Sequence, residues 1–148
     1  MMNTRIRDIL RRKGEDVYSV GPLATVIDAV NTMNDHHVGS VLVCEGGYPV
    51  GVFSEHDVLV RVVAAQRDPR QTLVRDVMTT RLYTASPDDT LLEVMRLMTD
   101  RRCRHVPVME GELLVGLVSI GDLTKATQYN LRQEVRELSS YIGGPYLS

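Results

Sequence analysis

Hydrophobic residues follow two alternating periods along the first part of this chain. Apolar and β-branched runs at 17–20, 40–44 and 50–53 predict short strands, and a glycine turn joins the last two into a hairpin. Over 26–33, apolar positions recur at intervals of three and four residues, which predicts a helix with one buried face. A second helix begins near Ser54, so this segment is predicted to fold as β-α-β-β-α.

The same order of elements recurs later in the chain. When residues 17–60 are laid over residues 82–125 without a gap, thirteen of 44 positions are identical. Many of the other pairs keep their polarity, so the chain is a tandem repeat. The second copy is predicted to contain strands at 82–85, 105–109 and 113–118, a helix over 91–98 and a further helix from Ser119.

Threonine precedes the first predicted helix in both copies. Thr25 and Thr90 stand directly before the apolar helical stretches, and threonine is a favoured N-cap residue. Glu93 lies three residues after Thr90 and predicts a full capping box, whereas Asp28 is the weaker equivalent after Thr25.

A short sequence in front of each copy also recurs. Ile6-Arg7-Asp8-Ile9-Leu10 matches Val74-Arg75-Asp76-Val77-Met78, and we call these two stretches the leading segments. The polar, proline-containing stretch 66–71 reads as a linker. We therefore expect a first repeat with its N-terminal segment over 1–65, a linker over 66–73, a second repeat over 74–126, and a terminal helix and tail over 127–148.

The last part of the chain has no counterpart in the first repeat. Leu131, Val135 and Leu138 are spaced four and three residues apart among charged residues, which predicts an amphipathic helix over 124–141. Gly143-Gly144-Pro145 is expected to end it. Such a helix either covers a surface of the protein or joins two subunits.

The repeated pattern favours an α/β (α+β) fold. One β-α-β-β-α unit leaves a sheet face that its own helices do not fully cover, and two units can pack sheet on sheet. The composition agrees with a globular protein, since 43% of the 148 residues are hydrophobic and 24% are charged.

Charge and hydropathy exclude several classes of protein. The formal net charge of −2 argues against a broad nucleic-acid-binding surface. No apolar run approaches the ~20 residues of a membrane span, and the N-terminus lacks the apolar stretch of a secretory signal. Cys44 and Cys103 have no metal-type spacing, so we expect reduced thiols in a cytoplasmic protein.

The strongest local motif lies where the hairpin leads into the second helix. It reads G-h-h-S-x-x-D, with h apolar, over 51–57 and again over 116–122. Serine and aspartate at these positions are normal helix-capping residues. The same groups could bind a nucleotide, because a helix N-terminus attracts phosphate and a carboxylate accepts hydrogen bonds from a ribose diol. The duplication of the motif favours the second interpretation.

These features together resemble a tandem pair of cystathionine-β-synthase (CBS) domains, a Bateman module. Two β-α-β-β-α repeats each end in the motif, Val74-Arg75-Asp76-Val77-Met78-Thr79 is similar to the family's usual start of a repeat, and Arg104-His105-Val106-Pro107-Val108 is similar to its central strand. The resemblance covers about residues 6–126. It implies repeats packed with pseudo-twofold symmetry and disc-shaped homodimers.

The resemblance also implies a function. Such modules regulate or sense and do not usually catalyse. They bind AMP, ADP, ATP, NAD(H) or S-adenosylmethionine in clefts between the repeats and transmit occupancy to a partner protein. The implied roles are ribose binding by Asp57 and Asp122, phosphate contacts by Ser54, Ser119, His56, Gly121, Arg104 and His105, and further hydroxyl contacts by Ser19, facing the Asp122 site, and Thr84, facing the Asp57 site.

The two implied sites are not equivalent. Many relatives carry arginine where this chain has His56, and Gly121 brings no side chain at the matching position. The first repeat has Gly39-Ser40 where the second has Arg104-His105. We therefore expect the site of the second repeat to bind the ligand better.

Two alternatives to a nucleotide sensor remain open at this stage. In a purely structural or protein-interaction module, both motifs would serve only as helix caps. In a redox enzyme, Cys103 between Arg102 and Arg104 would have a lowered pKa and react readily. His36-His37 reads as a solvated turn rather than a metal site, because no third ligand has suitable spacing.

Overall fold

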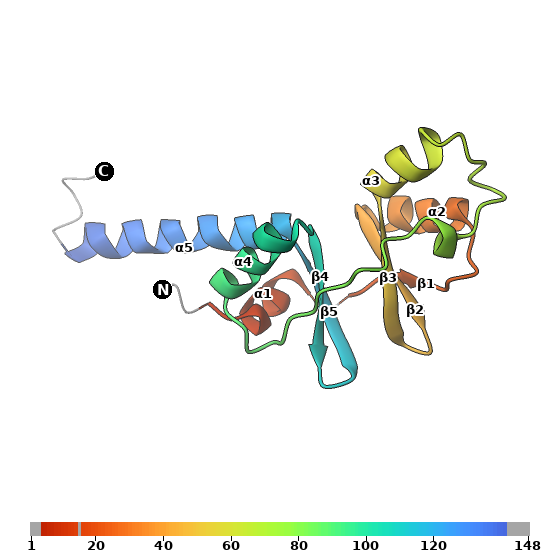
Figure 1. Ribbon diagram of the computed structural model, residues 1–148. Helices are drawn as coiled ribbons and strands as arrows, with labels where there is room; N and C mark the ends of the chain where they lie inside the picture. The colour runs from red at the N-terminus through yellow and green to blue at the C-terminus, as the bar shows by residue number, and fades with distance from the viewer. Residues whose placement is uncertain (1–3, 15, 142–148) are drawn as a thin grey trace.

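The computed structural model describes residues 4–14 and 16–141, and the expected stop at Gly143-Gly144-Pro145 lies outside them. The first repeat has the predicted element order (Figure 1). Its elements are β1 (Ser19–Val20), α2 (Val26–His36), β2 (Ser40–Glu45), β3 (Tyr48–Ser54) and α3 (Glu55–Asp57), which continues as the π-helix η1 (Val58–Val63).

The second repeat contains the predicted helices and hairpin but not its first strand. Its elements are the short helix η2 (Val74–Asp76), α4 (Leu91–Arg101), β4 (His105–Glu110), β5 (Leu113–Ser119) and α5 (Ile120–Tyr141). The strand predicted at 82–85 is wrong, because only Ala85 forms a bridge, parallel to Val108. In the first repeat the strand is real but short, and Ser19 pairs with Leu42.

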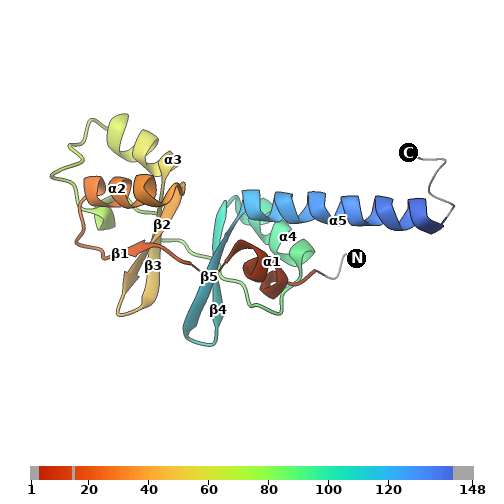
Figure 2. The same cartoon turned by 180° about the vertical axis from the view of Figure 1, so that it is seen from behind.

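The two hairpins have the same register, which positions both motifs alike. In the first sheet, ordered β1-β2-β3, Ser40 lies opposite Ser54. In the sheet of β4 and β5, His105 lies opposite Ser119. β3 contacts β5, so the two sheets meet along these strands and the helices lie outside them (Figures 1 and 2). The α+β fold of two packed repeats is confirmed.

The capping boxes differ from the prediction. Thr25 and Asp28 form the reciprocal pair, with the Thr25 hydroxyl accepting from Asp28 N at 3.3 Å and the Asp28 carboxylate accepting from Thr25 N at 3.2 Å. At Thr90 the hydroxyl accepts from Glu93 N at 3.2 Å. The complete capping box is therefore in the first copy, because the Asp28 carboxylate, on a shorter side chain than that of Glu93, accepts from the Thr25 backbone N–H.

The leading segments are exchanged between the repeats. The first forms α1 (Ile6–Lys13), and its apolar residues Ile6 and Leu10 are buried in the core of the second repeat, with Val94, Val106 and others. The second segment buries Val74 in the core of the first repeat. Each core is thus completed by a segment that precedes the other repeat.

The motif glycines allow the exchanged segments to approach closely. A Cβ atom on Gly116 would lie 2.7 Å from Leu10 Cδ2, and one on Gly51 would lie 2.5 Å from Met78 Sδ. Leu10 and Met78 occupy matching positions in the two leading segments. Each segment therefore lies against a strand that has no side chain at the contact point.

α5 combines two predicted elements into one continuous helix of 22 residues. Its first half packs beside α1 and α4 and buries Leu123 and Ala126. The second half extends away from the repeats (Figure 2) and exposes the predicted apolar stripe, Leu131, Val135 and Leu138. Among the residues that the structure describes, no helix is long and apolar enough to cross a membrane.

Candidate ligand-binding cleft

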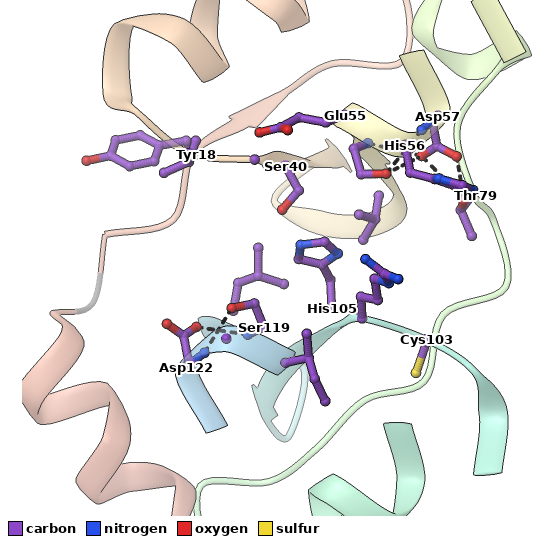
Figure 3. A pocket seen from close by; sticks show the side chains of 18 of the residues that line it. Tyr18, Ser40, Glu55, His56, Asp57, Thr79, Cys103, His105, Ser119 and Asp122 are labelled. Atoms are coloured by element: carbon purple, nitrogen blue, oxygen red, sulfur yellow. Dashed lines mark hydrogen bonds between the residues drawn. The ribbon is translucent and has the colours of Figure 1, made fainter. Parts of the chain in front are cut away.

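A cleft of about 930 Å³ lies between the two repeats, and both motifs line it (Figure 3). β3 and β5 contact each other, and each strand leads into a helix that begins at its motif, so both helix starts line the same cleft. The structure brings eight of the ten predicted site residues into its lining: Ser54, His56, Asp57, Arg104, His105, Ser119, Gly121 and Asp122.

Ser19 and Thr84 belong to the described chain but lie outside this lining. Both residues are exposed. Their neighbours Tyr18 and Tyr83 line the cleft instead. Successive side chains of an extended segment point to opposite faces, so a shift of one residue explains the difference.

Asp57 is held tightly at the start of α3. Its Oδ2 accepts from Ser54 N at 3.0 Å and from the Ser54 hydroxyl at 3.1 Å, and the Thr79 hydroxyl donates to Oδ1 at 3.2 Å. Arg61 Nε lies 3.6 Å from Oδ1, and the Asp57 side chain is only 6% exposed. This carboxylate already has most of the hydrogen bonds that it can accept.

Asp122 is more open. Its Oδ2 accepts from Ser119 N at 2.8 Å and from Lys13 Nζ at 2.6 Å. No residue that the structure describes donates a hydrogen bond to Oδ1, and the Asp122 side chain is 21% exposed. A free carboxylate oxygen facing a cleft can accept a hydroxyl from a ligand.

His105 lies between the two motifs (Figure 3). Burial lowers its pKa, and the nearby charges of Lys13 and Arg104 lower it further, while Asp122 and Asp57 act in the opposite direction. The imidazole is therefore neutral at pH 7 and can either donate or accept a hydrogen bond.

The cleft concentrates charged and titratable groups. All four histidines of the chain line it. Five permanent cations face four carboxylates, so the local charge is positive although the whole chain is slightly acidic. The cations are Lys13, Arg81, Arg101, Arg102 and Arg104, and the carboxylates are Asp16, Glu55, Asp57 and Asp122. Such a cleft favours anionic ligands.

Aromatic side chains stand at matching places in the two halves of the cleft. Tyr18 stacks on His36 with ring centroids 3.8 Å apart, and the Arg101 guanidinium lies over Tyr83 at 5.3 Å. His36 is thus placed by stacking, and the described residues contain no cluster of three metal-ligating side chains.

Cys103 is a half-buried free thiol between two arginines. Burial raises its pKa, although a backbone hydrogen bond partly opposes this effect. Arg102 and Arg104 are both exposed, so their solvated charges do not offset burial, and the lowered pKa of the redox alternative is not found.

Comparison with known proteins identifies the repeats. The sequence matches the CBS domain family twice, over residues 6–64 and 74–129. This chain is a tandem CBS-domain protein. The matches contain both leading segments and both motifs, so the resemblance seen in the sequence is confirmed.

Several CBS proteins are similar over most of the chain. The CBS domain-containing protein CBSX3, mitochondrial, of Arabidopsis thaliana is 35% identical over 97% of this chain and 74% of its own length. A solved CBS-domain-containing protein from Agrobacterium tumefaciens is 40% identical, with a TM-score of 0.78 over 84% of this chain and 99% of that chain. A putative signal-transduction protein with CBS domains from Burkholderia ambifaria is 35% identical, with a TM-score of 0.80 over 84% and 93%.

Two cleft residues that hydrogen-bond to the motif aspartates of this CBS protein were missed by the sequence analysis. Thr79 contacts Asp57, and Lys13 contacts Asp122. Each residue follows a leading segment by a few positions. Because each leading segment packs on the repeat that it does not precede, the order of the sequence does not reveal these contacts. The one available signal was that Lys13 is one of only two lysines in a chain with fifteen arginines.

Proposed function

We propose that this CBS protein is a regulatory module that binds an adenosine-containing ligand in the cleft between its repeats. The candidate ligands are AMP, ADP, ATP and NAD(H). The observation that carries the proposal is the single cleft that combines both S-x-x-D motifs with a surplus of cations. A nucleotide offers matching chemistry, namely a ribose diol for a carboxylate and phosphates for the cations.

The second repeat provides the better site in this proposal. Asp122 has an open carboxylate oxygen for the ribose hydroxyls, whereas the oxygens of Asp57 are occupied and buried. Ser119 and the backbone at the start of the 22-residue α5 then face the phosphates, together with Arg104 and His105. Gly121 leaves room for the phosphates beside the start of α5. A Cβ atom at this position would have only the Ser119 hydroxyl within 4 Å.

Regulation requires that the ligand prefer one arrangement of the chain. CBS proteins form a family of regulatory or sensor modules. Because the cleft is built from both repeats, a ligand that contacts both sides can favour one packing of the halves, and only this difference in affinity can shift the equilibrium. We propose that a partner protein reads the shift, that the chain forms a homodimer, and that it has no catalytic activity of its own.

We place this function in the cytoplasm. Cys44 and Cys103 are both free thiols, which agrees with a reducing compartment.

Replacing Asp122 by alanine should weaken nucleotide binding about tenfold or more. A hydrogen bond to a charged group contributes about 1.5–3 kcal/mol, and the ribose would lose its acceptor. Isothermal titration with the nucleotide that binds the wild-type chain measures the change. Asp122→Asn keeps the size and one acceptor oxygen, so it separates the loss of charge from the loss of the helix cap.

Asp100→Ala is the matched control for this titration. Asp100 is an exposed carboxylate on α4 outside the cleft, so its removal should leave the affinity unchanged. Equal affinities for the wild-type, Asp122→Ala and Asp100→Ala chains, all folded by circular dichroism, would contradict the proposed ribose contact.

A structural module without a ligand is the second candidate. It is favoured by the helix caps, because Ser54 and Ser119 each accept from the aspartate N–H, at 3.3 and 3.2 Å, and each aspartate accepts in return. Capping alone accounts for the two serines. It does not account for the surplus of cations that line the cleft, and the binding titration distinguishes the two candidates.

A further inference from the structure

The end of α1 lies against the open aspartate of the cleft. Lys13 is the last residue of α1, and its Nζ donates to Asp122 Oδ2 at 2.6 Å and to the Leu117 carbonyl at 2.5 Å. The two side chains are 33% and 21% exposed, so the pair faces the cleft rather than the core. An ammonium group therefore occupies Oδ2 of Asp122, the oxygen that the second hydroxyl of a ribose diol would use once the first has bound the open Oδ1.

The rest of α1 is fixed, so only the lysine side chain can move easily. Ile6 and Leu10 are buried in the core of the second repeat. The Arg12 guanidinium lies 4.1 Å from the ring centroid of Tyr129 on α5. Lys13 stands at the rim on this anchored helix, and the four-carbon stem of a lysine lets its charge reach several positions.

In the first repeat, the hydrogen bond to the motif aspartate comes from a neutral group. The Thr79 hydroxyl follows the other leading segment and donates to Asp57 at 3.2 Å. Both aspartates thus receive a side chain from in or near an exchanged segment. The one that reaches Asp122 is charged, whereas the cation beside Asp57, Arg61, comes from its own repeat. The charge of Lys13 also lowers the pKa of His105, so it acts on the centre of the cleft.

We propose that Lys13 makes the cleft selective for phosphorylated ligands, an inference that rests on the proposed nucleotide-binding function. A ribose diol that takes both oxygens of Asp122 displaces the ammonium group. An unphosphorylated nucleoside offers Lys13 no new partner, so the Lys13–Asp122 ion pair is lost without replacement when the nucleoside binds. A nucleotide offers a phosphate, which restores a charge-assisted contact. Lys13 is then a specificity-determining residue that exchanges Asp122 for the phosphate.

The test compares adenosine with AMP and ATP, because these ligands share the base and the ribose. The ratio of the adenosine Kd to the nucleotide Kd measures selectivity. Lys13→Met should reduce this ratio at least tenfold, with nucleotide binding weaker and adenosine binding equal or tighter. Lys13→Gln should behave in the same way, so a folding defect in one variant does not decide the result.

Two further variants serve as controls. Lys125→Met removes the only other lysine, which is exposed on α5 outside the cleft, and should keep the wild-type ratio. Lys13→Arg keeps the cation and should retain most of the selectivity. An unchanged ratio in folded Lys13→Met and Lys13→Gln would overturn the role of Lys13 and leave nucleotide binding standing. A wild-type chain that binds neither adenosine nor a nucleotide would overturn both proposals.

Discussion

Replacing Ile6 by alanine should destabilise the second repeat by about 3 kcal/mol, because removing a buried isoleucine side chain leaves a cavity. Ile6 is fully buried in the core formed by α4, β4 and β5, although it precedes the first repeat in sequence. Native-state amide exchange localises the effect. The amides of β4 and β5 should lose protection, while those of β2 and β3 keep most of theirs.

Val74→Ala is the reciprocal control for this prediction. Val74 is fully buried in the other core and precedes the second repeat in sequence. Its replacement should lower protection in β2 and β3 first. If Ile6→Ala instead weakens β2 and β3 while β4 and β5 stay protected, the exchange of the leading segments is wrong.

The second large effect is expected for Gly51→Val, which should destabilise the chain by about 3 kcal/mol. A Cβ atom there would lie 2.5 Å from Met78 Sδ and 3.1 Å from the Thr79 carbonyl. The sulfur can move, but the Thr79 carbonyl is fixed by its bond from Val52 N at 2.9 Å. Thermal unfolding should show a midpoint lower by roughly 10 °C for a chain of this size.

Gly21→Val is the matched control, since Gly21 is exposed and a Cβ atom there would meet nothing within 4 Å. Combining Gly51→Val with Met78→Ala should restore only part of the loss, because the contact with the Thr79 carbonyl remains. A Gly51→Val chain that melts like the wild type would contradict the close approach of the leading segment.

Much of the fold could be predicted because it depends on local pattern. The hairpin strands, the N-caps Thr25 and Thr90, and the strand-to-helix motifs all follow from periodicity and from residue types within a few positions. The duplication supports each of these predictions, because the same pattern of residues would have had to arise by chance in both copies. The match of the two copies also showed that Asp57 and Asp122 are equivalent in the chain.

The pairing of leading segments with cores could not be predicted. Ile6 and Val74 show that each segment has an apolar face, but both cores present similar apolar surfaces, so pattern alone does not select one. The positions of Lys13 and Thr79 depend on that selection, and both were missed. The strand expected at 82–85 failed for a related reason, because its pairing is decided by tertiary contacts that leave only the bridge at Ala85.

Thermal unfolding of the nucleotide-free chain with AMP, ADP, ATP, NAD, NADH and S-adenosylmethionine tests the central claim most directly. A ligand present at 100 times its Kd stabilises the folded state by about 2.7 kcal/mol. For this chain we expect one class of adenosine ligand to raise the midpoint by roughly 5–10 °C, and Asp122→Ala to reduce that rise. No rise with any of these ligands, on folded protein free of bound nucleotide, would contradict the account and favour the structural module.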